Sequence, residues 1–228
     1  GTWQQNAPFK KKFKSIMKKL LKNIIKKFGF EISRIPDEKE IKNLSFDEIF
    51  KKIIRNHKPV IFDIGANKGQ SIDRFLKVNN NAVIHSFEPN LDEFSLLKEK
   101  YSNNKNIKLN NIALGDKKNK KYFNVTEHSA NSSFLELKKD TNWIKLRSNQ
   151  QNVDKDNYIK KRVEVDIETL DAYCSQNSIK QIDIVKIDTQ GYEEQILIGC
   201  KKMIEAQKID ALEIEIVFSS VYEKYVCF

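Results

Sequence analysis

The chain has 228 residues, with 41 Lys and Arg against 31 Asp and Glu and a formal net charge of +10. This length corresponds to one globular domain. The 39% apolar and 10% aromatic residues exclude global disorder and fibrous repeats. No apolar run reaches the ~20 residues of a membrane-spanning helix, and no signal peptide is recognisable.

Three cysteines, Cys174, Cys200 and Cys227, form no CxxC pair and are odd in number. This pattern excludes a disulfide framework and favours a reducing compartment, so we expect a cytoplasmic protein. We also expect the three side chains to pack as small apolar residues.

The excess positive charge lies near the N-terminus, after residues 1–8, which we interpret as an unstructured terminus or a cloning remnant. Residues 9–28 contain nine lysines and no acid, and their apolar residues, from Phe9 to Phe28, recur with the period of a helix. We therefore predict a basic amphipathic helix over residues 9–30. It would either bind an anionic surface at the inner face of a membrane or pack on the domain. A nucleic-acid partner is disfavoured because the segment lacks the Arg, Gly and isolated aromatic residues of such arms.

Residues 31–57 are predicted to form a linker with a short helix near 46–55, and an α/β domain is predicted over 58–228. Strands at 60–66, 83–87 and 107–114 alternate with helices at 68–78 and 91–101. Such alternation predicts βαβ units with right-handed crossovers, a parallel sheet and helices on both faces.

The alternation is interrupted by an excursion at about 124–161. Segments 122–126 and 162–167 alternate as strands do, but residues 145–161 are too hydrophilic for a core and predict an excursion or lid. A short helix at 169–176, a strand at 182–187, a long helix at 191–207 and a strand at 211–218 are predicted to follow.

A glycine-bearing turn follows the first predicted strand. Its pattern, D-x-G-x-x-x-G, places Asp63, Gly65 and Gly69 where a ligand can approach the main chain. This spacing matches neither a dinucleotide-binding fingerprint nor a P-loop, so it suits a ligand without phosphate. Glu88 ends the second strand, where a carboxylate can accept both hydroxyls of a ribose. Each motif alone is weak, and together they indicate a nucleoside site.

At these positions the sequence resembles the FkbM type of S-adenosylmethionine-dependent methyltransferases. The matching segments are VIFDIGANKGQS (60–71), HSFEPN (85–90), LNNIALGD (109–116), IVKIDTQGYEEQILIG (184–199) and LEIEIVFSSVYE (212–223). The resemblance implies a class I, Rossmann-like methyltransferase sheet with S-adenosylmethionine across the carboxyl ends of its strands.

The resemblance also implies roles for individual residues in this sequence. The methionine part would lie against the first strand end, the ribose on Glu88, and the methyl group and acceptor near Asp188. The cofactor-binding residues implied in this way are Asp63, Gly65, Ala66, Asn67, Gly69, Glu88, Asn111, Ile112, Ala113 and Asp188, with Asn111 to Ala113 framing the adenine.

The sequence departs from the family pattern in three places. Thr189-Gln190-Gly191 replaces the commoner Val-Glu-Gly, which removes one acid from the site, and residues 143–161 match no motif. The fold normally ends with an antiparallel hairpin, whereas this sequence ends at Phe228, soon after the fifth strand. Either this hairpin has been lost or the sequence is partial, and we favour a partial sequence.

Methyl transfer to a hydroxyl requires alignment and removal of a proton. Asp188 is the leading candidate for the general base, and His128 is the second, although His128 equally fits a surface loop. Ser132 and Ser133 could contact the acceptor or the cofactor carboxylate, or be plain loop serines. Glu193 and Glu215 could bind substrate hydroxyls or a metal, or be satisfied by their neighbours. No cluster has metal-ligand spacing, so we expect no metal.

The leading hypothesis is an S-adenosylmethionine-dependent O-methyltransferase that acts on a hydroxyl of a glycan or related small metabolite, docked peripherally at a membrane. The alternative is a non-catalytic, membrane-associated module on a methyltransferase scaffold. A nicotinamide-dependent dehydrogenase is disfavoured by the spacing of the glycine loop.

Overall fold

The computed structural model describes residues 45–216 and 221–223. The predicted basic helix and most of the predicted linker lie outside these ranges, as do Cys227 and the end of the last predicted strand. Within the described ranges, no helix is long and apolar enough to cross a membrane.

Five parallel strands form the central sheet in the order β3-β2-β1-β7-β8. Their bounds are Val60–Ile64 for β1, Val83–Phe87 for β2, Ile107–Asn110 for β3, Ile184–Ile187 for β7 and Leu212–Ile214 for β8. Ile61 of β1 lies opposite Ile84 of β2 and Ile184 of β7. The strand order reverses between β1 and β7, and ligands of doubly wound sheets bind at the carboxyl ends beside this reversal.

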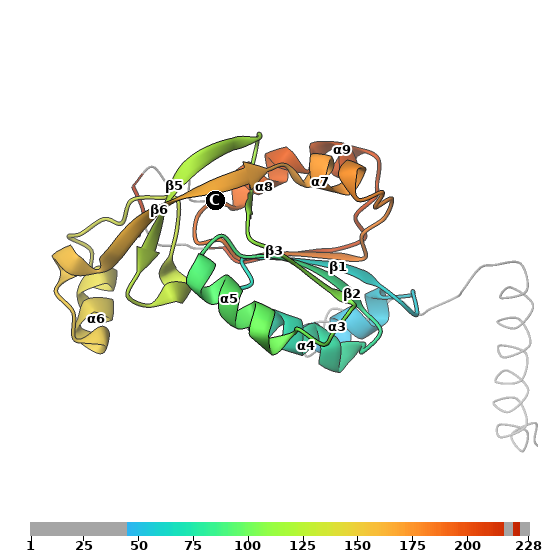
Figure 1. Ribbon diagram of the computed structural model, residues 1–228, viewed down its shortest axis with the longest axis horizontal. Coiled ribbons are helices and arrows are strands. Elements are labelled where there is room, and N and C mark those ends of the chain that lie inside the picture. Colours follow the sequence, from blue (N-terminus) through green and yellow to red (C-terminus); the bar gives the residue numbers. More distant parts are fainter. Residues whose placement is uncertain (1–44, 217–220, 224–228) are drawn as a thin grey trace, which may run out of the picture. The chain divides into compact units, whose positions relative to one another are not determined.

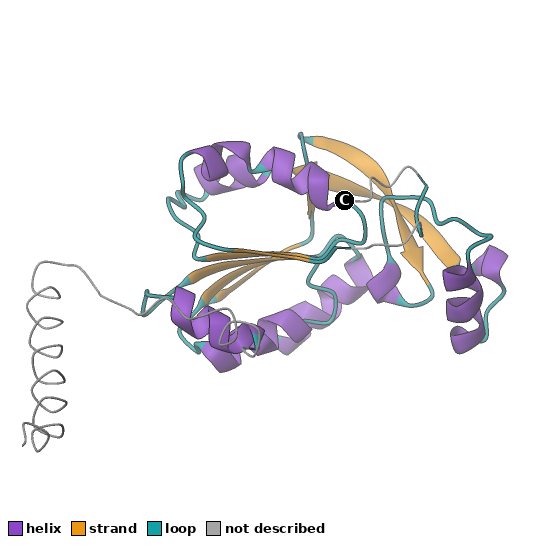
Figure 2. Ribbon diagram, turned by 180° about the vertical axis from the view of Figure 1, so that it is seen from behind, coloured by secondary structure: helices purple, strands orange, loops and turns teal. Residues whose placement is uncertain are grey.

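Helices cover both faces of this sheet (Figures 1 and 2). One layer contains α3 (Phe46–Ile53), α4 (Gln70–Val78) and α5 (Leu91–Lys100). The other contains α7 (Leu170–Gln176), α8 (Glu193–Gly199) and α9 (Lys201–Glu205). Because both faces are covered, the inner strands are apolar over most of their length, as the alternating pattern predicts.

Helix α3 falls in the linker predicted from the sequence, but it packs on the domain. A capping box between Ser45 and Glu48 defines its first turn. Phe50, only 3% exposed, belongs to the same core cluster as Phe75 of α4, and their ring centroids lie 5.6 Å apart. This segment therefore contributes to the core of the α/β unit.

The excursion is built on a second sheet with strand order β4-β6-β5 (Figure 1). It comprises β4 (Ala113–Leu114), β5 (Asn119–Thr126) and β6 (Ile159–Glu168), and β5 pairs antiparallel with β6. The connection between β5 and β6 contains the short helix η1 (Ser129–Asn131), α6 (Asn142–Gln151) and η2 (Lys155–Asn157).

The prediction that residues 145–161 contain no core is wrong at Tyr158, which is 1% exposed. Tyr158 packs with Ile144 of α6 and with Val221 and Tyr222 in a separate small cluster. Few apolar residues within 145–161 are needed here, because other segments of the same chain supply the rest of the cluster. The hydropathy of residues 145–161 does not include this contribution.

Two predicted elements are each divided in the structure. The predicted strand 107–114 becomes β3 and β4, which belong to different sheets. The division falls at Asn111, because its Nδ2 donates to the backbone oxygens of Glu88 and Pro89 at 2.9 and 3.2 Å. The predicted helix 191–207 divides into α8 and α9 at Cys200. There the carboxylate of Asp171 accepts from the backbone N–H groups of Lys202 and Met203 and so caps a new helix start.

Two cysteines lie in the described chain. Cys174 and Cys200 are both buried in the larger core cluster, which confirms their predicted role as packing residues. Burial raises the pKa of the Cys174 thiol to about 12 and that of Cys200 to about 11, so both remain protonated near neutral pH.

Candidate active site

The end of β1 approaches the end of β7 through Gly65. Gly65 has a φ of +82°, and a Cβ atom at this position would lie 1.9 Å from the backbone oxygen of Asp188. The backbone N–H groups of Gly65 and Ala66 donate to Phe87 O at 3.0 and 3.1 Å. A side chain at position 65 would therefore push apart the strand ends that form the site.

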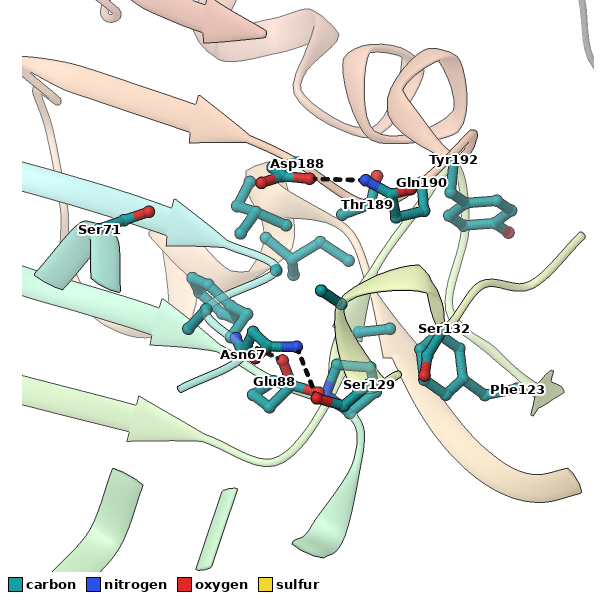
Figure 3. Close-up of a pocket in the computed structure, with 18 of the residues that line it drawn as sticks. Asn67, Ser71, Glu88, Phe123, Ser129, Ser132, Asp188, Thr189, Gln190 and Tyr192 are labelled. Carbon is teal, nitrogen blue, oxygen red and sulfur yellow. Dashed lines mark hydrogen bonds between the residues drawn. The ribbon is translucent and has the colours of Figure 1, made fainter. Parts of the chain in front are cut away.

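A pocket of about 300 Å³ opens at these strand ends (Figure 3). Its lining comes from the ends of β1, β2 and β7 on one side, and from β4, β5 and η1 on the other. The lining residues are Ile64, Gly65, Ala66, Asn67, Gln70, Ser71, Phe87, Glu88, Pro89, Ala113, Leu114, Phe123, Ser129, Ala130, Ser132, Phe134, Lys186, Asp188, Thr189, Gln190 and Tyr192.

Glu88 occupies the tip of β2 and is 6% exposed. Its Oε2 accepts from the backbone N–H of Asn67 at 2.7 Å, and its Oε1 accepts from that of Asn90 at 2.9 Å. Burial raises the pKa of Glu88 to about 7, although these two N–H groups act in the opposite direction. The carboxyl group is thus fixed in place, and it changes charge near neutral pH.

A buried lysine of the pocket lining, Lys186 of β7, joins the carboxylates of Asp63 and Asp188. Its Nζ lies 3.2 Å from Asp63 and 3.5 Å from Asp188, and it donates to Gly65 O at 3.0 Å. Burial alone would lower the pKa of Lys186, but the two carboxylates outweigh it and raise this pKa. Burial opposes ionisation of Asp188 as well, yet Lys186 and further hydrogen bonds lower its pKa. Lys186 therefore carries a positive charge and holds Asp188 as the carboxylate.

Asp63 of β1 is fully buried and does not belong to the pocket lining. Burial raises its pKa, and Lys186 opposes this shift. The Asp63–Lys186 pair therefore links β1 to β7 near their carboxyl ends, where the two residues lie opposite each other in the sheet.

The excursion closes the pocket on the side opposite Asp188 (Figure 3). Asn67 Nδ2 donates to Ser129 Oγ of η1 at 3.3 Å, which joins the glycine loop to the excursion. An aromatic wall of Phe123, Phe134 and Tyr192 lines the pocket beyond it, with ring centroids 5.0 Å apart for Phe123 and Phe134 and 4.6 Å for Phe134 and Tyr192.

A family model described as the methyltransferase FkbM domain matches residues 63–225. The chain belongs to the FkbM methyltransferase family. A curated relative, 2-O-methyltransferase NoeI of Sinorhizobium fredii, is 23% identical over 154 residues, which cover 67% of this chain and 61% of NoeI. Among solved structures, a methyltransferase FkbM from Methylobacillus flagellatus aligns over 69% of this chain and 33% of its own, with a TM-score of 0.44 and 14% identity.

The structure brings seven of the predicted site residues into the pocket lining. These are Gly65, Ala66, Asn67, Glu88, Ala113, Ser132 and Asp188. Gly69 instead begins α4, where Tyr101 donates its hydroxyl to Gly69 O at 2.9 Å. Asn111 and Ile112 precede the lining residue Ala113 but do not line the pocket. Their predicted contact with adenine stays a prediction.

Three further predicted residues have structural contacts outside the lining. Ser133 Oγ donates to Gln190 O at 2.7 Å. Glu193 is buried, and its Oε1 accepts from the backbone N–H groups of Thr189 and Gly191 and from the Thr189 hydroxyl. His128 is exposed beside the lining residue Ser129, and its carbonyl accepts from Thr126 Oγ1 at 2.8 Å.

Glu215 follows β8 and is exposed to solvent, but its carboxyl group reaches Gln190 and Asp188. Among the described residues, no group of three or more His, Cys, Asp and Glu side chains is arranged to hold a metal ion.

Sequence reasoning missed two groups of lining residues. Lys186 carries a signal in the sequence, because a lysine inside the apolar run IDIVKI indicates a buried partner charge. The aromatic wall carries no such signal, since its members belong to three segments that only the tertiary structure brings together.

Proposed function

We propose that this protein is an S-adenosylmethionine-dependent O-methyltransferase that acts on a hydroxyl group of a glycan or related small metabolite. The observation that carries the proposal is the joint presence of Glu88 and Asp188 in one pocket of an FkbM-family chain. The first is a buried carboxyl group at the tip of β2, and the second is a carboxylate held ionised by Lys186. The name of the relative, a 2-O-methyltransferase, supports oxygen as the acceptor atom.

The charge of the pocket suits S-adenosylmethionine. The described lining contains two acids, Glu88 and Asp188, and one cation, Lys186, which is itself paired with the buried Asp63. This balance favours a positively charged ligand and disfavours the phosphates of a nicotinamide dinucleotide. When bound, S-adenosylmethionine would supply a methyl group on a positively charged sulfur. Glu88 would accept hydrogen bonds from the ribose hydroxyls, and Gly65 would allow the ligand to approach the main chain.

The chain's own task is to align the acceptor and remove its proton. In the reaction the acceptor oxygen bonds to the methyl carbon as the carbon–sulfur bond breaks, and the hydroxyl proton is lost. We assign this proton to Asp188, which lines the pocket and is ionised. An aliphatic hydroxyl is a very weak acid, so a positioned base contributes about 10²- to 10⁴-fold to the rate.

Binding and turnover test the proposal separately. Isothermal titration with S-adenosylhomocysteine is expected to show binding by the wild type, and Glu88→Gln is expected to weaken it. Incubation with radiolabelled S-adenosylmethionine and a glycan panel is expected to label an acceptor, with a mass increase of one methyl group. Asp188→Asn should keep binding within a few-fold and lose about 100-fold or more of turnover. Failure of the wild type to bind would reject the proposal.

The non-catalytic alternative predicts a different combination of results. A scaffold without activity would bind S-adenosylhomocysteine but would transfer no label to any acceptor. The presence of Glu88, Asp188 and the Lys186 pairing argues against it, because a module without chemistry needs no ionised carboxylate in its pocket.

We further propose that residues 9–28 dock the enzyme on an anionic membrane surface, on the basis of their lysine-rich amphipathic pattern. Co-sedimentation with liposomes that contain an anionic lipid should deplete the full chain from solution. A chain without residues 1–30 should stay in solution. Equal pelleting of the two chains would reject the membrane proposal without affecting the enzymatic one.

A further inference from the structure

Gln190 connects two carboxyl groups, one inside the pocket and one at the surface. Its Nε2 lies 3.1 Å from Asp188 Oδ1 and 2.5 Å from Glu215 Oε2. Asp188 lines the pocket, whereas Glu215 lies on the solvent side, after β8. Figure 3 shows the amide of Gln190 directed at Asp188. Because one amide nitrogen contacts both carboxyl groups, Asp188 and Glu215 lie beside each other.

The orientation of this amide is fixed by contacts on its other side. Tyr222 donates its hydroxyl to Gln190 Oε1 at 3.1 Å, which leaves Nε2 to face the two carboxyl groups. Ser133 donates to the backbone oxygen of Gln190 at 2.7 Å. The backbone of Gln190 is left-handed, with a φ of +57°, so these contacts hold the residue in a conformation that side chains rarely adopt.

The charges around the pair are unequal. Lys186 on β7, itself paired with Asp63 on β1, lies 3.5 Å from Asp188 and favours negative charge there. Glu193 on α8 and Asp188 are the negative neighbours of Glu215. Glu215 is partly desolvated at this contact, and desolvation together with the neighbouring Asp188 raises its pKa to about 7. The proton shared by the pair therefore resides on the solvent side.

We infer that Gln190 is a positioning residue that couples Asp188 to Glu215, so that a proton received by Asp188 in the pocket leaves to solvent through Glu215. The inference rests on the proposed function, because methyl transfer to a hydroxyl releases one proton. That proton passes from the acceptor oxygen to the Asp188 carboxylate. It then passes to the neighbouring Glu215 carboxylate, and from there to water.

The coupling can be measured without an acceptor. Carbon-13 carboxyl NMR of the full chain, titrated from pH 4 to 9, is expected to show one step near pH 7 in the signals of both Asp188 and Glu215. In Glu215→Gln the step in the Asp188 signal should disappear. In Gln190→Leu the shared midpoint should rise by about one pH unit, because a donor to the ionised pair is lost.

Two further variants separate the bridge from packing. Gln190→Glu keeps the shape of the side chain but replaces its N–H donors with a third carboxyl group, so the midpoint should rise further. Gln181 donates to a single carboxylate elsewhere, with its Nε2 2.7 Å from Asp210 Oδ1, and Gln181→Leu should leave the step unchanged.

S-adenosylhomocysteine binding, measured on the same samples, distinguishes this inference from the proposed function. Binding by the wild type together with an Asp188 signal that titrates identically in the wild type, Glu215→Gln and Gln190→Leu would overturn the inference alone. A shared step without any binding would instead reject the proposed function and leave the coupling established.

Discussion

Replacing Lys186 with methionine should destabilise the protein strongly and in a pH-dependent way. The side chain is 5% exposed, and its Nζ contacts Asp63 at 3.2 Å, Asp188 at 3.5 Å and Gly65 O at 3.0 Å. Methionine would fill much of the same volume, but it would leave the fully buried Asp63 without its cation. Breaking a buried ion pair in this way costs about 3–5 kcal/mol. For a chain of this size each kcal/mol lowers Tm by about 2–4 °C, so we expect a fall of roughly 6–20 °C.

The pH dependence of this loss follows from Asp63. Burial raises the pKa of Asp63, and without Lys186 it would rise further. A carboxyl group whose pKa is raised on folding contributes stability at low pH that is lost as the pH increases. The difference in Tm between Lys186→Met and wild type should therefore be larger at pH 8 than at pH 5. Adding Asp63→Asn should restore part of the stability and remove this dependence.

Differential scanning fluorimetry across this pH range provides the assay. Lys108→Met is the matched control because Lys108 is an exposed lysine on β3, and its loss should change stability by less than about 0.5 kcal/mol. The reasoning would be refuted if Lys186→Met melted within about 2 °C of the wild type at pH 8, or if its deficit were equal at both pH values.

The remaining predictions concern Gly65 of the glycine loop, the carboxyl group of Glu88, and α3. The affinity for S-adenosylhomocysteine should rise as the pH increases through about 7, where Glu88 ionises. In calorimetry, Glu88→Gln should bind this ligand weakly, with an affinity that does not depend on pH. Because the raised pKa of Glu88 makes its contribution to stability fall as pH increases from about 4.5 to about 7, Glu88→Gln should melt above the wild type at pH 8. Gly65→Ala should abolish binding and lower Tm, since its Cβ would lie 1.9 Å from Asp188 O; unchanged binding would contradict the close approach of the two strand ends. Phe50→Ala should cost about 3–5 kcal/mol in denaturant unfolding, whereas Phe46→Ala, at a residue 62% exposed, should be nearly neutral; equal effects would contradict the packing of α3 on α4.

Much of the fold could be predicted from the sequence because its information is local. Apolar runs bounded by turns identify β1, β2 and β7, and helical periodicity identifies α4 and α5 between them. The positions of Gly65 and Glu88 at strand ends follow from the same pattern, since parallel strands bring their carboxyl ends to one edge. The sequence alone thus located two sides of the pocket, and the FkbM motifs indicated the class of ligand.

Only the tertiary structure decided how the site is completed. Asn111 directs the chain from the first sheet to the second, and η1 returns to meet Asn67, but neither contact leaves a periodic signal. The same is true of Gln190, whose role depends on Glu215, 25 residues later, and on Tyr222. Local patterns record which residues are buried, whereas the charge state of Asp188 depends on Lys186 and Glu215, whose separations and exposure are set by packing.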